Sequence, residues 1–280
     1  MNIAFQGESG AFSEEAVLAL HPNATAIASG SFEAVFEAVS SGAVDRGVIP
    51  IENSLFGSVH QNYDLLQERD LRIVAEIQLR IRHNLLVVPG SELKDIKSVC
   101  SHPQALGQCR SFLREHLAEA EIVVVYDTAG AAKMVSERAD GSRAAIASAI
   151  AGVQYKLTAI AEGIESDHRN YTRFLSLARM DDAGSLNPER GPFKTSVVYA
   201  QRENIPGSLY KSLAVFALRD IDLFKIESRP LVGSPGKYLF YLDLEGSTED
   251  ESIQNALRHL EEVAASVKVL GTYPVGPIID

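Results

Sequence analysis

Residues 2–21 read NIAFQGESGAFSEEAVLALH, a short apolar run that ends at Gly7 and leads into an alanine-rich segment. The run is typical of a strand, and the segment has apolar residues at helical spacing. The same rhythm continues with TAIASG before SFEAVFEAVSSG, and with RGVIPIEN before SVHQNYDLLQERD. Strands that alternate with helices in this way predict an α/β fold with a substantially parallel sheet.

A second series of strand and helix patterns follows between residues 98 and 148, and it repeats the first. Ser31 and Thr128 both stand where a helix N-cap is expected, and Arg46 and Arg143 both open the next strand at the same offset of 97 positions (143 − 46). A shared offset across helix and strand predicts two similar α/β lobes.

Two such lobes would leave a cleft between the carboxyl ends of their strands, where open α/β sheets bind ligands. Five polar or glycine-containing stretches fall at those ends, namely GESGAFS, IENS, CSHPQ, YDTAG and IAS. Any one of them taken alone is better explained as a loop with a helix cap. Five at equivalent ends favour a ligand site.

The stretch LRIVAEIQLRIRHNLLVV, residues 71–88, alternates apolar and polar residues, which predicts a long strand linking the lobes. One face is expected to carry Ile73, Ala75, Ile77, Leu79 and Ile81, and the other Arg72, Glu76, Gln78, Arg80 and Arg82. Arg80, Arg82 and His83 form a basic trio that could face an anion, but a solvated strand face is the better interpretation.

The pattern changes after Leu177. Residues 181–193 are polar with Gly and Pro and are predicted to be a linker. Residues 194–280 then follow the order βαββαβ, which predicts a ferredoxin-like α+β unit. Its first helix is expected to bury a stripe of four residues, Leu209, Leu213, Phe216 and Ala217. Since a small sheet leaves an edge and a face open, we expect a homodimer or homotetramer.

Composition narrows the functional classes. The 280 residues are 46% apolar and 22% charged, with a net charge of −11 and no apolar run of the roughly 18 residues that a membrane span requires. We therefore expect a protein with no membrane span, and the lack of a basic patch argues against nucleic-acid binding. The N-terminus has no signal-peptide pattern, so we expect a cytoplasmic location. Cys100 and Cys109 lack a CxxC or ligand-like partner and are expected to be buried free thiols.

The chemistry available to a cleft is limited, because the chain has no GxGxxG, P-loop, HExxH or GxSxG motif. A reaction without cofactor or metal, or plain binding, is what remains. Backbone N–H groups at helix starts near Ser13, Ser31, Ser101 and Thr128 would suit carboxylates. The candidate side chains are Asn53, Ser54, Gln104, Thr172 and Arg173.

Thr172 and Arg173 lie in the stretch NYTRF, residues 170–174. Arg173 could bind a carboxylate through two parallel hydrogen bonds. The Thr172 hydroxyl is a weak acid, but it can donate a hydrogen bond to a departing oxygen, as the elimination of water would require. From spacing alone, a strand or cap hydroxyl for Thr172 and a surface ion pair for Arg173 are the better interpretation.

The whole chain resembles the prephenate dehydratases. The resemblance depends on motifs in a fixed order: GESGAFSE, IPIENSLFGSV, HNLLV, SHPQALGQC, DTAGAA, AAIAS and NYTRFLSL, followed by ESRP in an ACT regulatory domain. It implies a catalytic domain over residues 1–180, with lobes of about 1–75 plus 155–180 and about 80–150 that are like periplasmic binding proteins. The ACT domain would cover 194–280.

The resemblance implies decarboxylating dehydration of prephenate to phenylpyruvate on the route to L-phenylalanine, with no cofactor. Thr172 would be the catalytic hydroxyl, with Arg173 and Phe174 as its companions in the TRF motif. The residues expected to bind substrate are Asn53, Ser54, Ser101, Gln104, Thr128, Arg173 and Phe174. L-Phenylalanine would bind two ACT segments, Gly207–Ser208–Leu209–Tyr210 and Glu227–Ser228–Arg229–Pro230.

The sequence departs from the family pattern at Glu8 and Ala11, and GSLY replaces the commoner GALV at 207–210. The second change leaves the strength and sign of regulation open. Two alternatives also remain: an arogenate dehydratase, which acts on the aminated analogue, and a non-catalytic sensor of small ligands. Because a strand begins at Asn2, we expect no additional N-terminal helical domain.

Overall fold

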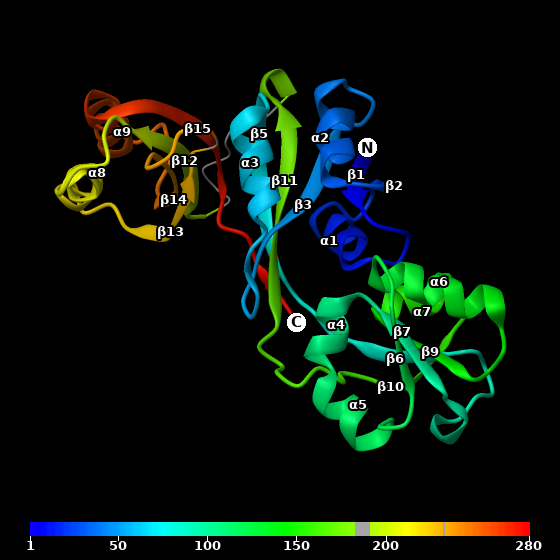
Figure 1. Ribbon diagram of the computed structural model, residues 1–280. Helices are drawn as coiled ribbons and strands as arrows, with labels where there is room; N and C mark the ends of the chain where they lie inside the picture. Colours follow the sequence, from blue (N-terminus) through cyan, green and yellow to red (C-terminus); the bar gives the residue numbers. More distant parts are fainter. Residues whose placement is uncertain (183–190, 232) are drawn as a thin grey trace. The chain divides into compact units, whose positions relative to one another are not determined.

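The computed structural model describes residues 1–182, 191–231 and 233–280. The chain forms two compact units. The first contains Met1–Asn62, Ile77–Phe174 and Ile278–Asp280, and the second contains Tyr63–Glu76 and Leu175–Pro277. The path of the chain is shown in Figure 1. No helix in the described ranges is long and apolar enough to cross a membrane.

The first sheet has the order β16-β5-β11-β3-β1-β2, with β4 paired to β3. Its strands are β1 (Asn2–Gln6), β2 (Thr25–Ser29), β3 (Arg46–Asn53), β4 (Gly57–Ser58), β5 (Leu71–Arg80), β11 (Tyr171–Arg179) and β16 (Ile278–Ile279). The helices that follow β1, β2 and β4 are α1 (Phe12–Leu20), α2 (Phe32–Ser40) and α3 (His60–Glu68). β1 runs parallel to both β2 and β3, as the alternation of strands and helices predicts.

The core of this lobe is built from alternate strand residues and one face of α1. Ile3 and Phe5 of β1 and Phe174 of β11 pack against Ala16 and Val17, and each is at most 2% exposed. Burial of five such side chains stabilises the sheet on which the candidate residues of β3 and β11 lie, at roughly 25 cal/mol per Å² of apolar surface.

The second sheet also belongs to the first unit and has the order β10-β6-β9-β7-β8. Its strands are β6 (Asn84–Val87), β7 (Ser98–Ser101), β8 (Glu121–Val124), β9 (Arg143–Ala147) and β10 (Thr158–Ala161). Its helices are α4 (Pro103–Gln108), α5 (Arg110–His116), α6 (Thr128–Arg138) and α7 (Ala149–Gln154), and the short 3₁₀ helix η1 spans Leu93–Asp95. β7 is parallel to β8 and β9, whereas β6 is antiparallel to β9 and β10.

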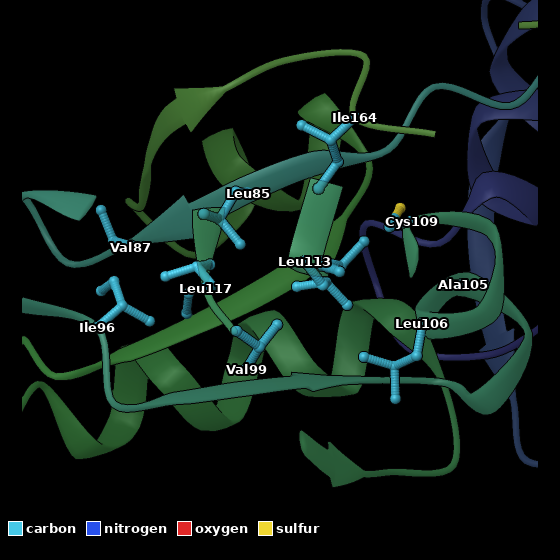
Figure 2. Close-up of a cluster of buried hydrophobic side chains, with 12 residues drawn as sticks. Leu85, Val87, Ile96, Val99, Ala105, Leu106, Cys109, Leu113, Leu117 and Ile164 are labelled. Atoms are coloured by element: carbon cyan, nitrogen blue, oxygen red, sulfur yellow. The ribbon is translucent and has the colours of Figure 1, made fainter. Parts of the chain in front are cut away.

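Figure 2 shows the core on one side of this sheet, where Leu85, Val99 and Leu113 point toward one another. Cys109 lies in the same cluster, and both it and Cys100 are buried free thiols, as predicted. Burial raises the pKa of both thiols, so each stays protonated at neutral pH.

The stretch 71–88 is not one strand. β5 ends at Arg80 and β6 begins at Asn84, in the other sheet. The backbone N–H of Ile81 donates to Asn170 O at 2.8 Å and that of His83 to Glu165 Oε2 at 3.0 Å, so residues 81–83 leave the ladder. The stretch therefore links the lobes, as expected, but through a break. β10 pairs with β6, so residues 158–161 lie in the second lobe, whereas the sequence had placed 155–180 with the first.

Three of the four predicted repeat positions are occupied as expected and one is shifted. Arg46 and Arg143 open β3 and β9, and Ser31 caps α2 by accepting from Ala34 N at 3.2 Å. Thr128, however, is the first residue of α6, and Asp127 is its cap. The prediction of a cap at Thr128 was wrong by one residue, because Asp and Thr are both good caps and they are adjacent.

The second unit contains the four-stranded sheet β13-β14-β12-β15, in which each pairing is antiparallel. Its elements are β12 (Phe193–Gln201), α8 (Ser208–Ala217), β13 (Leu223–Pro230), β14 (Tyr238–Glu245), α9 (Glu251–Val263) and β15 (Ala264–Pro274), after η2 (Met180–Asp182). This is the predicted βαββαβ order with the ferredoxin-like strand arrangement. The predicted linker, 181–193, falls mostly on 183–190, which lie outside the described residues.

The predicted apolar stripe of α8 is confirmed only in part. Phe216 is buried and Leu213 packs against the same core, whereas Leu209 is 38% exposed and Ala217 is also exposed. Glu76, expected on a solvated face, is 2% exposed, and its Oε1 lies 2.7 Å from Lys194 Nζ. A buried carboxylate needs such a partner, and here it comes from β12.

Candidate active site

Thr172 is the second residue of β11, and it is 8% exposed. Successive strand residues point to opposite faces, so Thr172 and Phe174 share one face while Arg173 lies on the other. The Phe174 ring is 2% exposed and packs into the core of the first lobe. Phe174 therefore anchors the strand that carries Thr172, and its predicted contact with substrate has no support in this geometry.

The Thr172 hydroxyl is held by Asn53, at the end of β3. Asn53 Nδ2 donates to Thr172 Oγ1 at 2.9 Å and to Asn170 Oδ1 at 2.8 Å. Its carbonyl oxygen accepts from the backbone N–H groups of Leu55 at 3.0 Å and Phe56 at 3.1 Å. These two backbone donors fix which side of the amide is oxygen, so the NH2 group faces Thr172.

The hydrogen bond from Asn53 restricts the direction in which the Thr172 hydroxyl can donate its own proton. A hydroxyl has one proton and two acceptor positions, and here one acceptor position is taken by the Asn53 amide. The Thr172 proton must therefore point elsewhere, toward whatever acceptor lies beside it. This arrangement makes Thr172 a hydrogen-bond donor in a mostly buried position.

Ser54 holds the same strand ends together. Its hydroxyl donates to Arg169 O at 2.6 Å and accepts from Tyr171 N at 2.9 Å, and its own backbone N–H donates to Tyr171 O at 2.8 Å. Three hydrogen bonds thus fix the start of β11 against the end of β3. The structure brings Asn53, Ser54 and Thr172 together, as the sequence predicts.

Asn170 and Glu52 complete this cluster, and sequence reasoning assigned a role to neither. Asn170 is fully buried, and its Nδ2 has no hydrogen-bond partner among the residues that the structure describes. Arg173 is 7% exposed, and its Nη1 lies 3.3 Å from Glu52 Oε1. Arg173 therefore already faces a carboxylate of the protein, and its role as a substrate ligand stays a prediction.

The three candidate residues on the second lobe differ in burial and in their hydrogen bonds. Ser101 is fully buried, and its hydroxyl donates to Ile146 O at 2.6 Å, which joins β7 to β9. Gln104 is half-buried at the second residue of α4, and its N–H donates to His102 Nδ1 at 3.3 Å. Thr128 is half-buried at the start of α6. The geometry supports Thr128 and Gln104 as candidates better than Ser101.

His83 is another buried group that the sequence analysis left on a solvated face. It is 2% exposed, and its Nε2 contacts Gln108 Oε1, while Phe12 packs edge-on against its ring at 5.4 Å between centroids. Burial lowers the pKa of His83, although Gln108 and Glu165 act in the opposite direction. His83 is thus a neutral imidazole between the lobes, and a solvated face was the wrong interpretation for this residue.

The loop after β1 fastens the first lobe to the second. The Glu8 carboxylate accepts from Tyr126 OH at 2.7 Å and from Lys133 Nζ at 3.1 Å. Ser148 Oγ donates to Gly10 O at 2.6 Å. A Cβ at Gly10, where φ is +92°, would lie 2.7 Å from Ala151 Cα, so only glycine permits this approach.

We expect Glu8→Gln to lower the free energy of unfolding at pH 7 by about 1 kcal/mol or less, since the pair is about a third exposed. The hydrogen bond from Tyr126 and then that from Lys133 lower the pKa of Glu8 from 4.5. The contribution of the carboxylate is therefore present above pH 4.5 and disappears as the pH falls through the lower folded pKa. Urea unfolding at pH 7 and at pH 3 measures this difference.

The control for this prediction is Glu119→Gln, at an exposed glutamate outside the loop contact. It should leave the unfolding free energy nearly unchanged at both pH values. Equal stability of Glu8→Gln and the unaltered protein at pH 7 would show that the loop contact contributes nothing measurable.

The second unit carries the predicted regulatory segments. Gly207 precedes α8 with φ +83° and gives it no side-chain cap, and Leu209 and Tyr210 are 38% and 76% exposed. On β13, Glu227 Oε2 lies 3.6 Å from Lys225 Nζ. Arg229 makes two contacts with the carboxylate of Asp64, at 3.2 and 2.5 Å. Arg229 is therefore bound to the protein itself in this structure.

These features define a class: a mixed α/β protein with a two-sheet first unit that presents an amide-held threonine, joined to a ferredoxin-like unit. Comparison with known proteins gives the family. The profile of the prephenate dehydratase family matches residues 3–182. The arogenate dehydratase/prephenate dehydratase 2 of Arabidopsis thaliana, named chloroplastic, is 48% identical over an alignment of 284 positions, which covers 98% of this chain and 73% of that protein. The chain belongs to the prephenate dehydratase family.

Two solved structures are similar over nearly the whole chain. The prephenate dehydratase from Arthrobacter aurescens in complex with L-Phe has a TM-score of 0.89 at 33% identity, covering 98% of this chain and 90% of that one. GqqA, described as a novel type of quorum-quenching acylase, has a TM-score of 0.89 at 35% identity, covering 98% of each chain. The same fold therefore occurs in proteins with different described activities.

Proposed function

We propose that this chain is a lyase that converts prephenate to phenylpyruvate, water and CO2. Membership of the prephenate dehydratase family supports the reaction class. The observation that carries the proposal is the Thr172 hydroxyl, which accepts from Asn53 and so has its own proton available for a leaving oxygen. A positioned donor of this kind is what the elimination of a ring hydroxyl requires.

In this mechanism the ring carboxylate leaves as CO2, and its bonding electrons enter the ring. The C–O bond to the ring hydroxyl breaks at the same time, and the hydroxyl takes up a proton and leaves as water. The ring becomes aromatic, so no electron sink is needed. Thr172 donates a hydrogen bond to the departing oxygen, and a stronger acid or water supplies the net proton because a threonine hydroxyl is too weak an acid.

The side-chain carboxylate of prephenate is proposed to lie near Thr128, at the N-terminus of α6, because the helix dipole favours an anion at that end. Asn53, Ser54, Gln104 and Arg173 remain proposed contacts with substrate. For Arg173 the nearby Glu52 suggests a second role, which is to hold the end of β3 against β11.

The first test is to mix the protein with prephenate at neutral pH and to follow phenylpyruvate by its absorbance in alkali. Turnover establishes the reaction. Comparison of kcat/KM on prephenate and arogenate then separates the two dehydratase activities, which relatives such as the Arabidopsis protein carry together in their names. A folded protein that turns over neither substrate would refute the proposal and favour a non-catalytic sensor.

Asn53→Asp and Asn53→Ala should each lower kcat by roughly 10- to 10²-fold, because both remove the donor that directs the Thr172 hydroxyl. Asn53→Asp is the more specific test of the hydrogen bond from Asn53 Nδ2 to Thr172. It keeps the shape and the oxygen that accepts from Leu55 and Phe56, but presents an acceptor to Thr172. Steady-state kinetics on prephenate measure the effect, and full activity of Asn53→Asp would contradict the proposed orientation.

L-Phenylalanine is proposed to regulate the enzyme from the second unit, which we assign as an ACT domain. A hollow of about 210 Å³ lies beside the start of α8, lined in part by Gln201, Ser208 and Lys211. The buried Gln201 Nε2 has no hydrogen-bond partner within residues 1–182, 191–231 and 233–280, and it is proposed to bind the carboxylate of the effector together with Lys211. The segments at 207–210 and 227–230 remain the proposed effector contacts.

Inhibition by L-phenylalanine in the same assay tests this regulation. Glu227→Ala should weaken the inhibition, and unchanged sensitivity would remove Glu227 from the site. The proposed state is a homodimer or homotetramer, since β13 and β15 are edge strands of the sheet. A cytoplasmic location also remains a proposal from the sequence.

Acylase activity, as described for GqqA, gains no support from the contacts at Thr172. An acyl-transfer nucleophile needs a base that takes the proton from the hydroxyl oxygen. The contact that the structure gives Thr172 Oγ1 is instead a donated hydrogen bond from an amide.

A further inference from the structure

The first unit contains a hollow of about 710 Å³ that the proposed reaction does not use. It lies between the start of α1, the segment after β5, the face of α7 and the segment after β10. Its volume is within the range of roughly 300–1,000 Å³ that is typical of small-molecule sites. Thr172 and Asn53 are not among its lining residues.

Part of the lining of this hollow is apolar, and we call this part the apolar floor. Phe12 of α1, Leu86 of β6 and Leu157 before β10 line it, and Val153 of α7 is 83% exposed at its margin. Such a floor can hold a hydrocarbon or aromatic group away from water. The apolar part is therefore suited to the side chain of a ligand rather than to a bare ion.

Charges of both signs face the hollow from opposite elements. Arg82 comes from the segment after β5 and Glu15 from α1, and neither side chain has a hydrogen-bond or ion-pair partner in the described part of the chain. Burial raises the pKa of Glu15, while the Arg82 charge acts in the opposite direction. The two side chains line the same hollow, and no ion pair joins them in the described part of the chain.

The mixture of charges decides the class of ligand. The guanidinium groups of Arg80 and Arg82 would repel a simple cation. A simple anion would be repelled by the carboxylates that also line the hollow, which are those of Glu15, Glu162, Glu165 and Asp280. We propose that the hollow binds the zwitterion of an α-amino acid. Its carboxylate would face Arg82, its ammonium would face Glu15, and its side chain would lie on the apolar floor.

This site would act on the links between the lobes. The first link between the lobes is residues 81–83, which contain Arg82 and follow Arg80 at the end of β5, and the second is residues 162–170, between β10 and β11, which contain Glu162 and Glu165. These four residues all line the hollow. Glu165 already joins the links, since its Oε2 accepts from His83 N at 3.0 Å. An amino acid held between the links would restrain any change in the angle between the two lobes, which is a way to control turnover.

A thiol placed at the margin of the hollow can report on occupancy. Cys100 and Cys109 are fully buried, and burial raises the pKa of both, so they should not react with a charged alkylating reagent. Val153→Cys then supplies a reactive thiol at the site. Val124→Cys, at a position 61% exposed and not lining the hollow, is the matched control.

Saturating millimolar L-leucine or L-phenylalanine should slow alkylation of the Val153→Cys protein by roughly fivefold or more and leave the Val124→Cys protein unaffected. Adding Arg82→Gln or Glu15→Gln to Val153→Cys should raise the half-protecting concentration by roughly tenfold or more. Phenethylamine and 3-phenylpropanoate, which each lack one charge, should not protect at the same concentration.

Each other outcome overturns the proposal. Absence of protection by either amino acid means that the hollow is not a site, and equal protection in the Arg82→Gln and Glu15→Gln proteins means that these groups do not bind the ligand. Equal protection by 3-phenylpropanoate means an anion site instead. The readout does not use turnover, so its failure is distinct from failure of the dehydratase assay.

Discussion

Thr172→Ala should lower kcat for prephenate by about 10²- to 10³-fold and leave KM nearly unchanged. In the proposed mechanism the hydroxyl donates to an oxygen whose negative charge develops only as the C–O bond breaks, so the interaction is stronger in the transition state than in the bound substrate. The strand itself should not change, because the neighbouring Phe174 keeps it in the core. Steady-state kinetics with prephenate measure both constants.

Thr172→Ser is the matched control, since it keeps the hydroxyl and the acceptor for Asn53 Nδ2. It should retain appreciable activity, whereas Thr172→Val, which keeps the shape without the hydroxyl, should be as impaired as the alanine variant. A rise in KM without a fall in kcat for Thr172→Ala would assign the hydroxyl to substrate binding. An inactive Thr172→Ser protein with an intact fold would argue against a simple donor role.

Lys194→Met should destabilise the second unit by roughly 3–5 kcal/mol, because it removes the ammonium that accompanies a buried carboxylate. Lys194 Nζ lies 2.7 Å from Glu76 Oε1, and the two side chains are 6% and 1% exposed. Gly276 N also donates to Glu76 Oε1 at 3.2 Å. This hydrogen bond would still stabilise the Glu76 carboxylate after Lys194 is replaced. Urea unfolding monitored by circular dichroism measures the loss.

Two variants test the cause of this loss. Adding Glu76→Gln to Lys194→Met should recover part of the stability, because a neutral amide costs less to bury than an unpaired carboxylate. Lys94→Met removes a lysine that lies 2.7 Å from Glu92 Oε2 on the surface, with side chains 75% and 66% exposed, and should cost less than about 1 kcal/mol. Similar losses for the two lysine variants would contradict the argument from burial.

The sequence predicted the elements well where one local pattern sufficed. The run at Asn2–Gln6 and the alternation at Arg46–Asn53 are strands, and the order βαββαβ is present after Phe193. It failed where a distant residue set the environment. Glu76 looks like a surface residue until Lys194, 118 positions later, is packed against it, and residues 81–83 look like a strand until Asn170 and Glu165 take their backbone N–H groups.

Contacts between residues that are distant in sequence also limit the prediction of the candidate site. Asn53 and Thr172 are 119 positions apart, so no local pattern predicts their hydrogen bond, and resemblance to a family was needed to select Thr172. Resemblance in turn could not distinguish a residue that faces a ligand from one that supports the fold. Ser101 and Phe174 share motifs with the candidates, yet both are buried with structural partners.

The second unit is discontinuous in sequence, since Tyr63–Glu76 belong to it together with Leu175–Pro277. Lys268 Nζ donates to three carbonyl oxygens at the end of α3, and Tyr241 OH donates to Tyr63 O at 3.0 Å. A chain shortened at Asp182 would therefore not retain the intact structure of the part that remains. It would leave α3 with unpaired carbonyls and Glu76 without its lysine, so loss of the regulatory half and damage to the catalytic half could not be separated by truncation.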